Sequence, residues 1–287
     1  MGEDILNAIE EFFNNILRSL AKSLLEGTFD SINESVDDAK SLLGVTPQIW
    51  DGNMFRLIKS ISETVILPIA GLIFSAIMIH NLINSIIDGN SFKDFEFEII
   101  PKFIFKTCLG VLVLSNAFEI TMAIFDVGYH LISSATGLIG DTNLSNFKDL
   151  DSALKDLGGG ELLGLIINCI IMKITLFIIT LLLNIIVVGR MIEIFLYVFV
   201  APIPFATFGN REWGTVGQNY VKNLAALALQ GLLMIIILGI YTSMIATLAL
   251  DFTDIGDAMI RCLITSGTMC FMLMKCGAIS KSICNAI

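Results

Sequence analysis

Few side chains in this sequence could carry out chemistry, and the most notable are charged residues inside long apolar runs. Lys173 lies within the almost uninterrupted hydrocarbon of Leu162–Val188, and Arg190 follows that run directly. A charge at the centre of a bilayer costs from about 2.5 to more than 10 kcal/mol, so each of these needs a partner, water or the interior of an assembly. Glu119 lies in an earlier apolar run, which makes an ion pair with Lys173 one hypothesis. Alternatively, each charge faces a separate watery space or a subunit contact.

Arg190 and Glu193 form a second polar pair. They are three residues apart, so on a helix they share one face as an i,i+3 pair. The pair is either an intramembrane structural contact or no more than an interfacial anchor.

Recognisable catalytic and metal-binding motifs are absent from the sequence. Its two histidines, His80 and His130, do not form an H-E-x-x-H pair, and no P-loop or G-x-S-x-G pattern occurs. Ile255-Gly256-Asp257 lacks the preceding glycine of an intramembrane aspartyl site and falls in an expected loop. The six cysteines lie in or beside apolar runs without a CxxC pair, as small buried hydrophobes do. We therefore expect no enzymatic activity, no bound metal and no cofactor.

The composition points to a membrane protein. Of 287 residues, 55% are hydrophobic and 15% are charged, against roughly 25% charged residues in soluble domains. The net charge of −10 argues against a protein that grips nucleic acid through its bulk surface, although it is compatible with the transient passage of a polyanion. The acidic start, MGEDILNAIEEFF, lacks the basic region of a secretory signal, so we do not expect a cleaved targeting peptide.

Residues 1–60 are predicted to form an amphipathic helical N-terminal segment. Apolar residues recur at helical spacing and predict a helix of about six turns: Ile5, Ile9, Phe12, Phe13, Ile16, Leu20 and Leu24. Asp30 is a plausible N-cap for a second amphipathic helix, and Gly44, Pro47 and Gly52 indicate a loop. The segment either lies on a membrane surface, packs on a neighbouring subunit or packs on the membrane domain.

Residues 61–287 predict a polytopic transmembrane domain. Crossing a bilayer takes about 20 apolar residues, and runs of that kind occur at about 65–87, 107–125, 162–188, 224–250 and 259–283. An outer loop is expected at about 128–161. The fold class is therefore all-α, with about five to six transmembrane helices and an amphipathic N-terminal helical segment.

Residues 191–208 decide between five spans and six. Pro202 and Pro204 interrupt any helix there, and the backbone groups that they free cannot face lipid. A full crossing would give six spans, whereas a broken segment gives five. With the N-terminus outside, five spans leave the outer loop at 251–258 without any Lys or Arg, so the positive-inside rule favours five. The basic residues that this arrangement gathers on the inner side are Lys93, Lys102, Lys106, Arg190, Arg211, Lys222 and Lys281.

The polar turn after these prolines is a candidate contact site. Arg211, Glu212 and Trp213 cannot all face hydrocarbon, and tryptophan suits the headgroup level. Together with Pro202 and Pro204 they form an expected partner or interface contact. The alternative is membrane anchoring alone.

The stretch GRMIEIFLYVFVAPIPFATFGNREWGTVGQNYVKNLAALALQG resembles the TrbL-like polytopic inner-membrane proteins of conjugative type IV secretion systems. The matching features are an arginine entering an apolar helix, the Ala-Pro-Ile-Pro tract, the polar turn, and the Ala-rich span after Tyr220. The resemblance implies a channel or scaffold subunit in the cytoplasmic membrane. It implies other membrane subunits, transport ATPases and a coupling protein as partners, DNA as a transient substrate, and a homo-oligomeric ring.

Two other function classes remain open from the sequence. A small-solute transporter would carry binding groups at related midplane positions of two halves, and Pro68 and the Pro202–Pro204 tract are not convincingly related by a repeat. A stand-alone pore protein is usually a shorter chain. The presence of a relaxase gene and a secretion ATPase gene nearby would distinguish conjugation from both.

Overall fold

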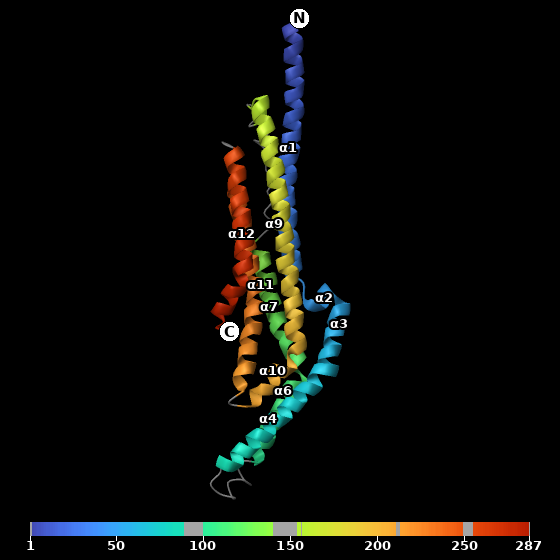
Figure 1. Ribbon diagram of the computed structural model, residues 1–287, viewed down its shortest axis with the longest axis vertical. Helices are drawn as coiled ribbons and strands as arrows, with labels where there is room; N and C mark the ends of the chain where they lie inside the picture. Colours follow the sequence, from blue (N-terminus) through green and yellow to red (C-terminus); the bar gives the residue numbers. More distant parts are fainter. Residues whose placement is uncertain are drawn as a thin grey trace. The chain divides into compact units, whose positions relative to one another are not determined.

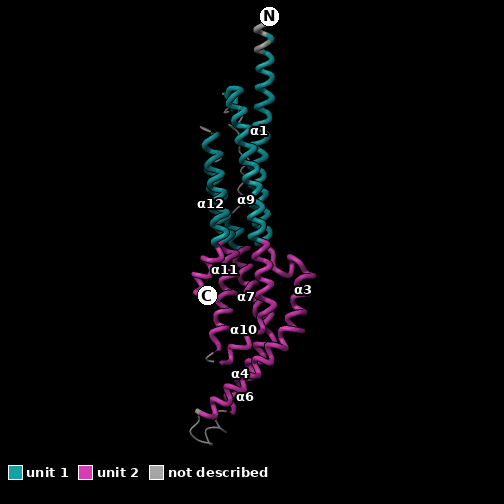
Figure 2. Tube along the Cα trace, viewed as in Figure 1, with its two compact units in different colours: residues 1–43, 134–187, 234–275 teal, residues 44–133, 188–233, 276–287 magenta. Residues whose placement is uncertain are grey.

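The fold is all-α throughout the part of the chain that the computed structural model describes, which is residues 2–88, 100–139, 154, 155, 157–210, 213–248 and 255–286. Within these described residues, five helical runs are long and apolar enough to cross a membrane, which confirms the predicted polytopic class and agrees with five spans. These runs are Gly52–Ile87, Ala117–Ile139, Gly159–Gly209, Gly214–Thr247 and Gly256–Ile283. The chain divides into two compact units, each assembled from three separate stretches (Figure 2).

Unit 1 comprises residues 1–43, 134–187 and 234–275. Its first element is the single helix α1, Gly2–Leu43, so Asp30 lies in mid-helix and caps no second helix. Eight buried positions of α1, with Phe29 buried beside them, repeat every 11 residues: Leu17, Ala21, Leu25, Thr28, Ile32, Val36, Ala39 and Leu43. This period, about 3.67 residues per turn, keeps one face of a nearly straight helix against its neighbours.

Helix α9, Gly159–Val200, lies alongside α1 in unit 1 (Figure 1). The two helices run parallel, because neighbouring residues follow the same order along both: Asn14 lies beside Gly159, Gly27 beside Lys173 and Ser35 beside Thr180. Residues 234–248 of α11, Gly214–Leu248, and residues 255–275 of α12, Ile255–Ile283, also belong to the unit. A small internal space is lined by residues from all four helices.

The length of α9 exceeds what one crossing requires. Its 42 residues extend about 63 Å at 1.5 Å per residue, whereas the hydrocarbon core of a bilayer is about 30 Å thick. Residues 191–200 continue α9 without a break. The helix break expected over 191–208 is therefore confined to residues 201–208. Part of α9 therefore lies outside the hydrocarbon.

Unit 2 comprises residues 44–133, 188–233 and 276–287. It begins with α2, Pro47–Trp50, and α3, Gly52–Ile61, which Asp51 caps by accepting hydrogen bonds from the amides of Asn53 and Met54 at 2.9 Å each. Then η1, Ser62–Ile66, leads into α4, Leu67–Asp88. The expected domain boundary at residue 60 falls within this run of helix.

The π-turn η1 has a local cause in the sequence. The Leu67 amide donates to the carbonyl of Ser62 instead of the carbonyl one residue later. Pro68 follows at once, and a proline has no N–H and crowds the turn before it. A single widened turn accommodates that crowding without ending the helix.

The second predicted span is interrupted. Helix α6, Ile100–Ser115, ends and α7, Ala117–Ile139, begins around a turn at Asn116, so residues 107–125 do not form one helix. Asn116 donates to the carbonyl of Leu112 at 2.8 Å, and such local bonding favours turns over continued helix. Helix α7 then continues to Ile139, so the connection expected at about 128–161 starts later than its predicted position.

The core of unit 2 forms around α10, Pro202–Ala206. Phe205 packs in a cluster with buried residues of α7, α9 and α11, including Phe118, Phe195 and Leu224. The next residue, Ala206, packs in a second cluster made by α4 and α6, which includes Phe74. The proline-containing segment is therefore the point at which these helices meet.

Candidate functional site

The connection between α9 and α11 in unit 2 is the first candidate site. Helix α10 is followed by η3, Thr207–Gly209, and the Thr207 hydroxyl donates to the carbonyl of Pro204 at 2.7 Å and accepts from the amide of Gly217 at 3.1 Å. Pro202 and Pro204 are buried. A helix break at membrane depth must satisfy its backbone groups internally, and Thr207 does so from both sides.

A pair of amide side chains fixes the polar turn to α4. Asn210 donates from Nδ2 to Oδ1 of Asn81 at 2.9 Å, and Asn81 donates from Nδ2 to the carbonyl of Gly209 at 2.9 Å. Asn210 also accepts from the amide of Trp213 at 3.1 Å. Sequence reasoning missed Asn81 as a partner, because 129 residues separate it from Asn210.

Trp213 is 55% exposed beside this turn. Arg211 and Glu212, which were predicted with it as a contact site, lie outside the described residues. On α11, after the turn, Tyr220 donates to the carbonyl of Tyr197 at 2.7 Å, and its ring packs edge to face on that of Phe205 with 5.8 Å between the ring centres. A rigid base thus presents an exposed aromatic side chain, an arrangement suited to an interface or a partner.

Arg190 is buried, with 7% exposure, in unit 2. Its Nη2 donates to the carbonyl of Leu227 on α11 at 3.4 Å, and its Nε is buried without a hydrogen-bond partner. Gly231, one turn further along α11, leaves the space that the guanidinium fills. Glu193 is half-buried and forms none of the ion pairs found among the described residues.

Glu119 has a partner that the sequence did not suggest. Its Oε1 lies 2.5 Å from Nζ of Lys59, which is also 3.8 Å from Glu63 and 5.6 Å from the centre of the Phe118 ring. Glu119 lies in the first turn of α7, where a negative charge also complements the helix dipole. Lys59 is therefore a partner of Glu119 within unit 2.

Lys173 belongs to unit 1, where it borders a polar cleft between α1 and α9. The cleft has a volume of about 260 Å³ and is lined by Thr28, Ser31, Glu34, Ser35, Asp38, Lys173, Leu176, Phe177 and Thr180. Ser35 and Thr180 share a hydrogen bond of 2.8 Å across it. Lys173 takes part in none of the ion pairs found in the described part of the chain.

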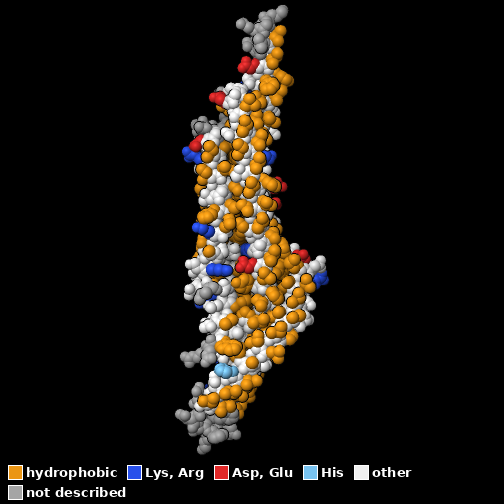
Figure 3. Space-filling model, viewed as in Figure 1, with side chains coloured by type: hydrophobic (Ala, Val, Ile, Leu, Met, Phe, Trp, Pro, Cys, Tyr) orange, Lys and Arg blue, Asp and Glu red, His pale blue; other side chains and the backbone are white. Residues whose placement is uncertain are grey.

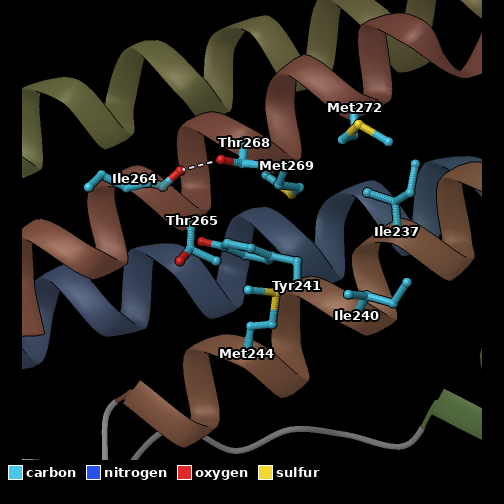
Figure 4. Close-up of a pocket in the computed structure, with 9 residues that line it drawn as sticks. All are labelled: Ile237, Ile240, Tyr241, Met244, Ile264, Thr265, Thr268, Met269 and Met272. Atoms are coloured by element: carbon cyan, nitrogen blue, oxygen red, sulfur yellow. Dashed lines mark hydrogen bonds between the residues drawn. The ribbon is translucent and has the colours of Figure 1, made fainter.

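An apolar pocket of about 280 Å³ lies between α11 and α12 in unit 1 (Figure 4). Its polar atoms are already satisfied: Thr265 and Thr268 each donate to a carbonyl of their own helix at 2.8 Å, and Tyr241 shares a 2.8 Å hydrogen bond with Ser266. Aliphatic and methionine side chains make up the remaining wall. The pocket offers contacts to hydrocarbon and none that would orient a polar substrate.

Both units have extensive apolar surface, and Figure 3 shows hydrophobic side chains over much of the visible face. Exposed residues follow α9 at intervals of three and four, among them Leu163, Ile167, Ile170, Ile174, Phe177, Ile178, Leu181 and Ile185. In water such a surface would aggregate. It is the surface expected of helices covered by lipid or by other subunits.

Similarity to known proteins identifies the family of this chain. A model of the family described as "TrbL/VirB6 plasmid conjugal transfer like protein" matches residues 32–202, a stretch that ends at Pro202 and includes Glu119, Lys173, Arg190 and Glu193. No curated protein and no solved structure matches the chain. Because the matched stretch covers more than half of the sequence, the resemblance found in the residues is confirmed. The chain is a multi-pass membrane protein that belongs to the TrbL/VirB6 plasmid conjugal transfer like family, whose members are components of type IV secretion systems.

Proposed function

We propose that this chain is a channel or scaffold subunit in the cytoplasmic membrane that supports DNA transfer by a conjugative type IV secretion system. The low burial of its spans carries the proposal. In three of the five runs, only 22% of the most apolar 18-residue window is buried within the chain. Helices that bury so little against one another need lipid and further subunits to cover them.

Within unit 2, the arrangement of polar groups favours a scaffold that acts in an assembly. Thr207, Asn81, Asn210 and Tyr220 use their hydrogen bonds to hold helices together. A conduit for DNA is then a property of several copies or of several subunits, and a homo-oligomeric ring is the simplest arrangement. Other membrane subunits, transport ATPases and the coupling protein are the proposed partners, and DNA is a transient substrate.

Deletion of the gene from its mobile element, with complementation in trans, tests this function. We expect transfer to be lost and to be restored by the wild-type chain, while the membrane potential and solute uptake stay unchanged. Unaltered transfer in the deletion strain would reject the proposal, and a specific uptake defect would favour a solute transporter.

A substitution of Trp213, the exposed aromatic residue at the polar turn, tests the proposed function at a single site. Trp213→Ala should reduce transfer at least about tenfold without lowering the amount of protein in the membrane, because an exposed tryptophan on a rigid base often dominates a contact. Val216→Ala is the matched control, since Val216 is 53% exposed in the turn of helix that follows. Arg211→Ala extends the test to the neighbouring predicted contact. Normal transfer by both the Trp213 and Arg211 variants would remove the turn from the function.

A further inference from the structure

The N-terminal part of α1 is an apolar surface without a partner inside the described part of the chain. Within unit 1, Gly159 at the start of α9 lies beside Asn14, and α1 extends past that point (Figure 1). Residues 8–13 are all exposed. Six large apolar residues share one face of this part of the helix: Ile5, Ile9, Phe12, Phe13, Ile16 and Leu20. We call these six residues the α1 stripe.

The α1 stripe is distinct from the face that α1 uses inside unit 1. The buried face begins at Leu17 and Ala21, and at about 100° per residue its centre lies about 130° around the helix from the centre of the stripe. The stripe therefore does not belong to the packing of the unit. Phe12 is 67% exposed and Phe13 is 60% exposed, so a large apolar area is available to an external partner.

The charges of α1 indicate the chemistry of that partner. Helix α1 contains nine acidic and three basic residues. Arg18 donates to the carbonyls of Leu154 and Lys155 at 3.1 and 2.8 Å. Lys40 pairs with Asp37 at 3.5 Å, and Lys22 also has a partner in the structure. The basic charges are thus engaged, whereas acidic side chains such as Glu10 and Glu11 are exposed.

We infer that the α1 stripe binds an amphipathic helix of another protein, one whose apolar face is flanked by lysine and arginine. Such a helix would cover the stripe, and a basic residue on its flank would complement the exposed carboxylate of Glu10, which lies about 110° around α1 from the centre of the stripe. A membrane surface fits less well, because helices that lie on anionic lipid carry basic residues on their polar face. A second α1 fits less well, because pairing would bring two acidic helices together.

A binding experiment with the full-length protein in nanodiscs of zwitterionic lipid tests the inference. The probes are two dye-labelled amphipathic peptides with the same apolar face, one with lysine and one with glutamate on its flanks. Fluorescence anisotropy should show the lysine peptide binding at least about tenfold more tightly, a difference of about 1.4 kcal/mol. Higher ionic strength should reduce that preference.

Matched variants show whether the stripe is the binding surface. The combined change Ile9→Ser and Phe13→Ser should weaken binding of the lysine peptide at least about tenfold. Ile49→Ser is the control, because Ile49 is 73% exposed and lies outside both α1 and the five membrane-capable runs. Equal binding of the two peptides, or unchanged binding by the double variant, would overturn the inference.

A photo-crosslinking residue at Phe12 identifies the occupant in cells that carry the complete transfer system. An adduct with another protein of that system, mapped to a basic amphipathic segment, is the expected result. An adduct with lipid or with a second copy of α1 would refute it. The identity of the partner rests on the proposed function, whereas binding of the peptides does not. Loss of peptide binding would therefore count against the α1 stripe alone, and unaltered transfer in the deletion strain would count against the proposed function alone.

Discussion

The guanidinium of Arg190 occupies the space that a side chain at Gly231 would need. A Cβ built at Gly231 meets Nη2 and Cζ of the arginine and also Cδ1 of Ile132. The glycine thus allows α7, α9 and α11 to meet around a buried charge. Such small residues let membrane helices approach closely.

Gly231→Ala should destabilise the protein by about 1–3 kcal/mol, because the added methyl overpacks the contact with Arg190. Thermal unfolding of the purified protein in detergent measures the effect. Gly164→Ala is the control, since nothing lies within 4 Å of a Cβ at that position, and alanine there should be neutral or stabilising by about 0.5–1 kcal/mol. Equal stability of the two variants would contradict the prediction, because it would show that the Arg190 side chain can move aside with no loss of stability.

Arg190→Leu should leave the protein at least as stable as the wild type. The arginine makes a long hydrogen bond and leaves Nε unsatisfied, and a buried charge without a full set of partners carries a desolvation cost that an apolar side chain does not. The unfolding temperature and the transfer frequency should be measured together. Loss of transfer at unchanged stability would give the charge a functional role, whereas a large fall in stability would contradict the prediction.

Lys59 and Glu119 should be energetically coupled. Lys59→Met leaves Glu119 without this partner, Glu119→Gln removes the closer of the two carboxylates near Lys59, and the double variant removes both members of the pair. Because both side chains are partly exposed, we expect a coupling of about 1 kcal/mol or less. A double-mutant cycle on unfolding measures it. Lys173→Met combined with Glu119→Gln is the control cycle and should be additive.

The amide pair of Asn81 and Asn210 should contribute to the stability of the polar turn. Asn210→Leu leaves the Asn81 amide without this partner, and a part-buried amide that loses its hydrogen bond costs about 1–3 kcal/mol. Asn84→Leu is the control, because Asn84 is exposed and its contact with His80 is 3.4 Å long. Unfolding of both variants and protease sensitivity near residue 210 provide the comparison. Similar effects of the two variants would exclude a special role of the pair.

The sequence was sufficient for the features that depend on long apolar runs. The five membrane-capable helices and the amphipathic N-terminal helix follow from hydrophobic length and periodicity, which continue over many residues. The division at Asn116 was missed, because the residues on both sides are apolar and only a short Ser-Asn step interrupts them. Local hydrogen bonding decides the helix end there, and hydropathy does not detect it.

The pairing of charges was harder to predict. The hypothesis of a Glu119–Lys173 pair relied only on both charges lying in apolar runs, whereas within unit 2 Glu119 pairs with Lys59. Lys59 lies in α3, before the first predicted span. Basic residues are common in the connections that precede membrane spans, so its sequence position did not indicate a partner. Contacts of this kind depend on how helices dock, and neither spacing nor composition specifies that.

The π-turn at Ser62–Ile66 sets the rotational phase of the helix that carries Lys59. A π-turn holds one residue more than an α-helical turn, so it rotates α3 by about 100° relative to α4. Lys59 faces Glu119 in this rotated setting. Deleting a single residue from Ser62–Ile66 would restore regular helix, keep every side chain of the pair and direct Lys59 away from α7. The one extra residue of the π-turn therefore sets the angle about the helix axis at which the side chains of α3 project relative to those of α4.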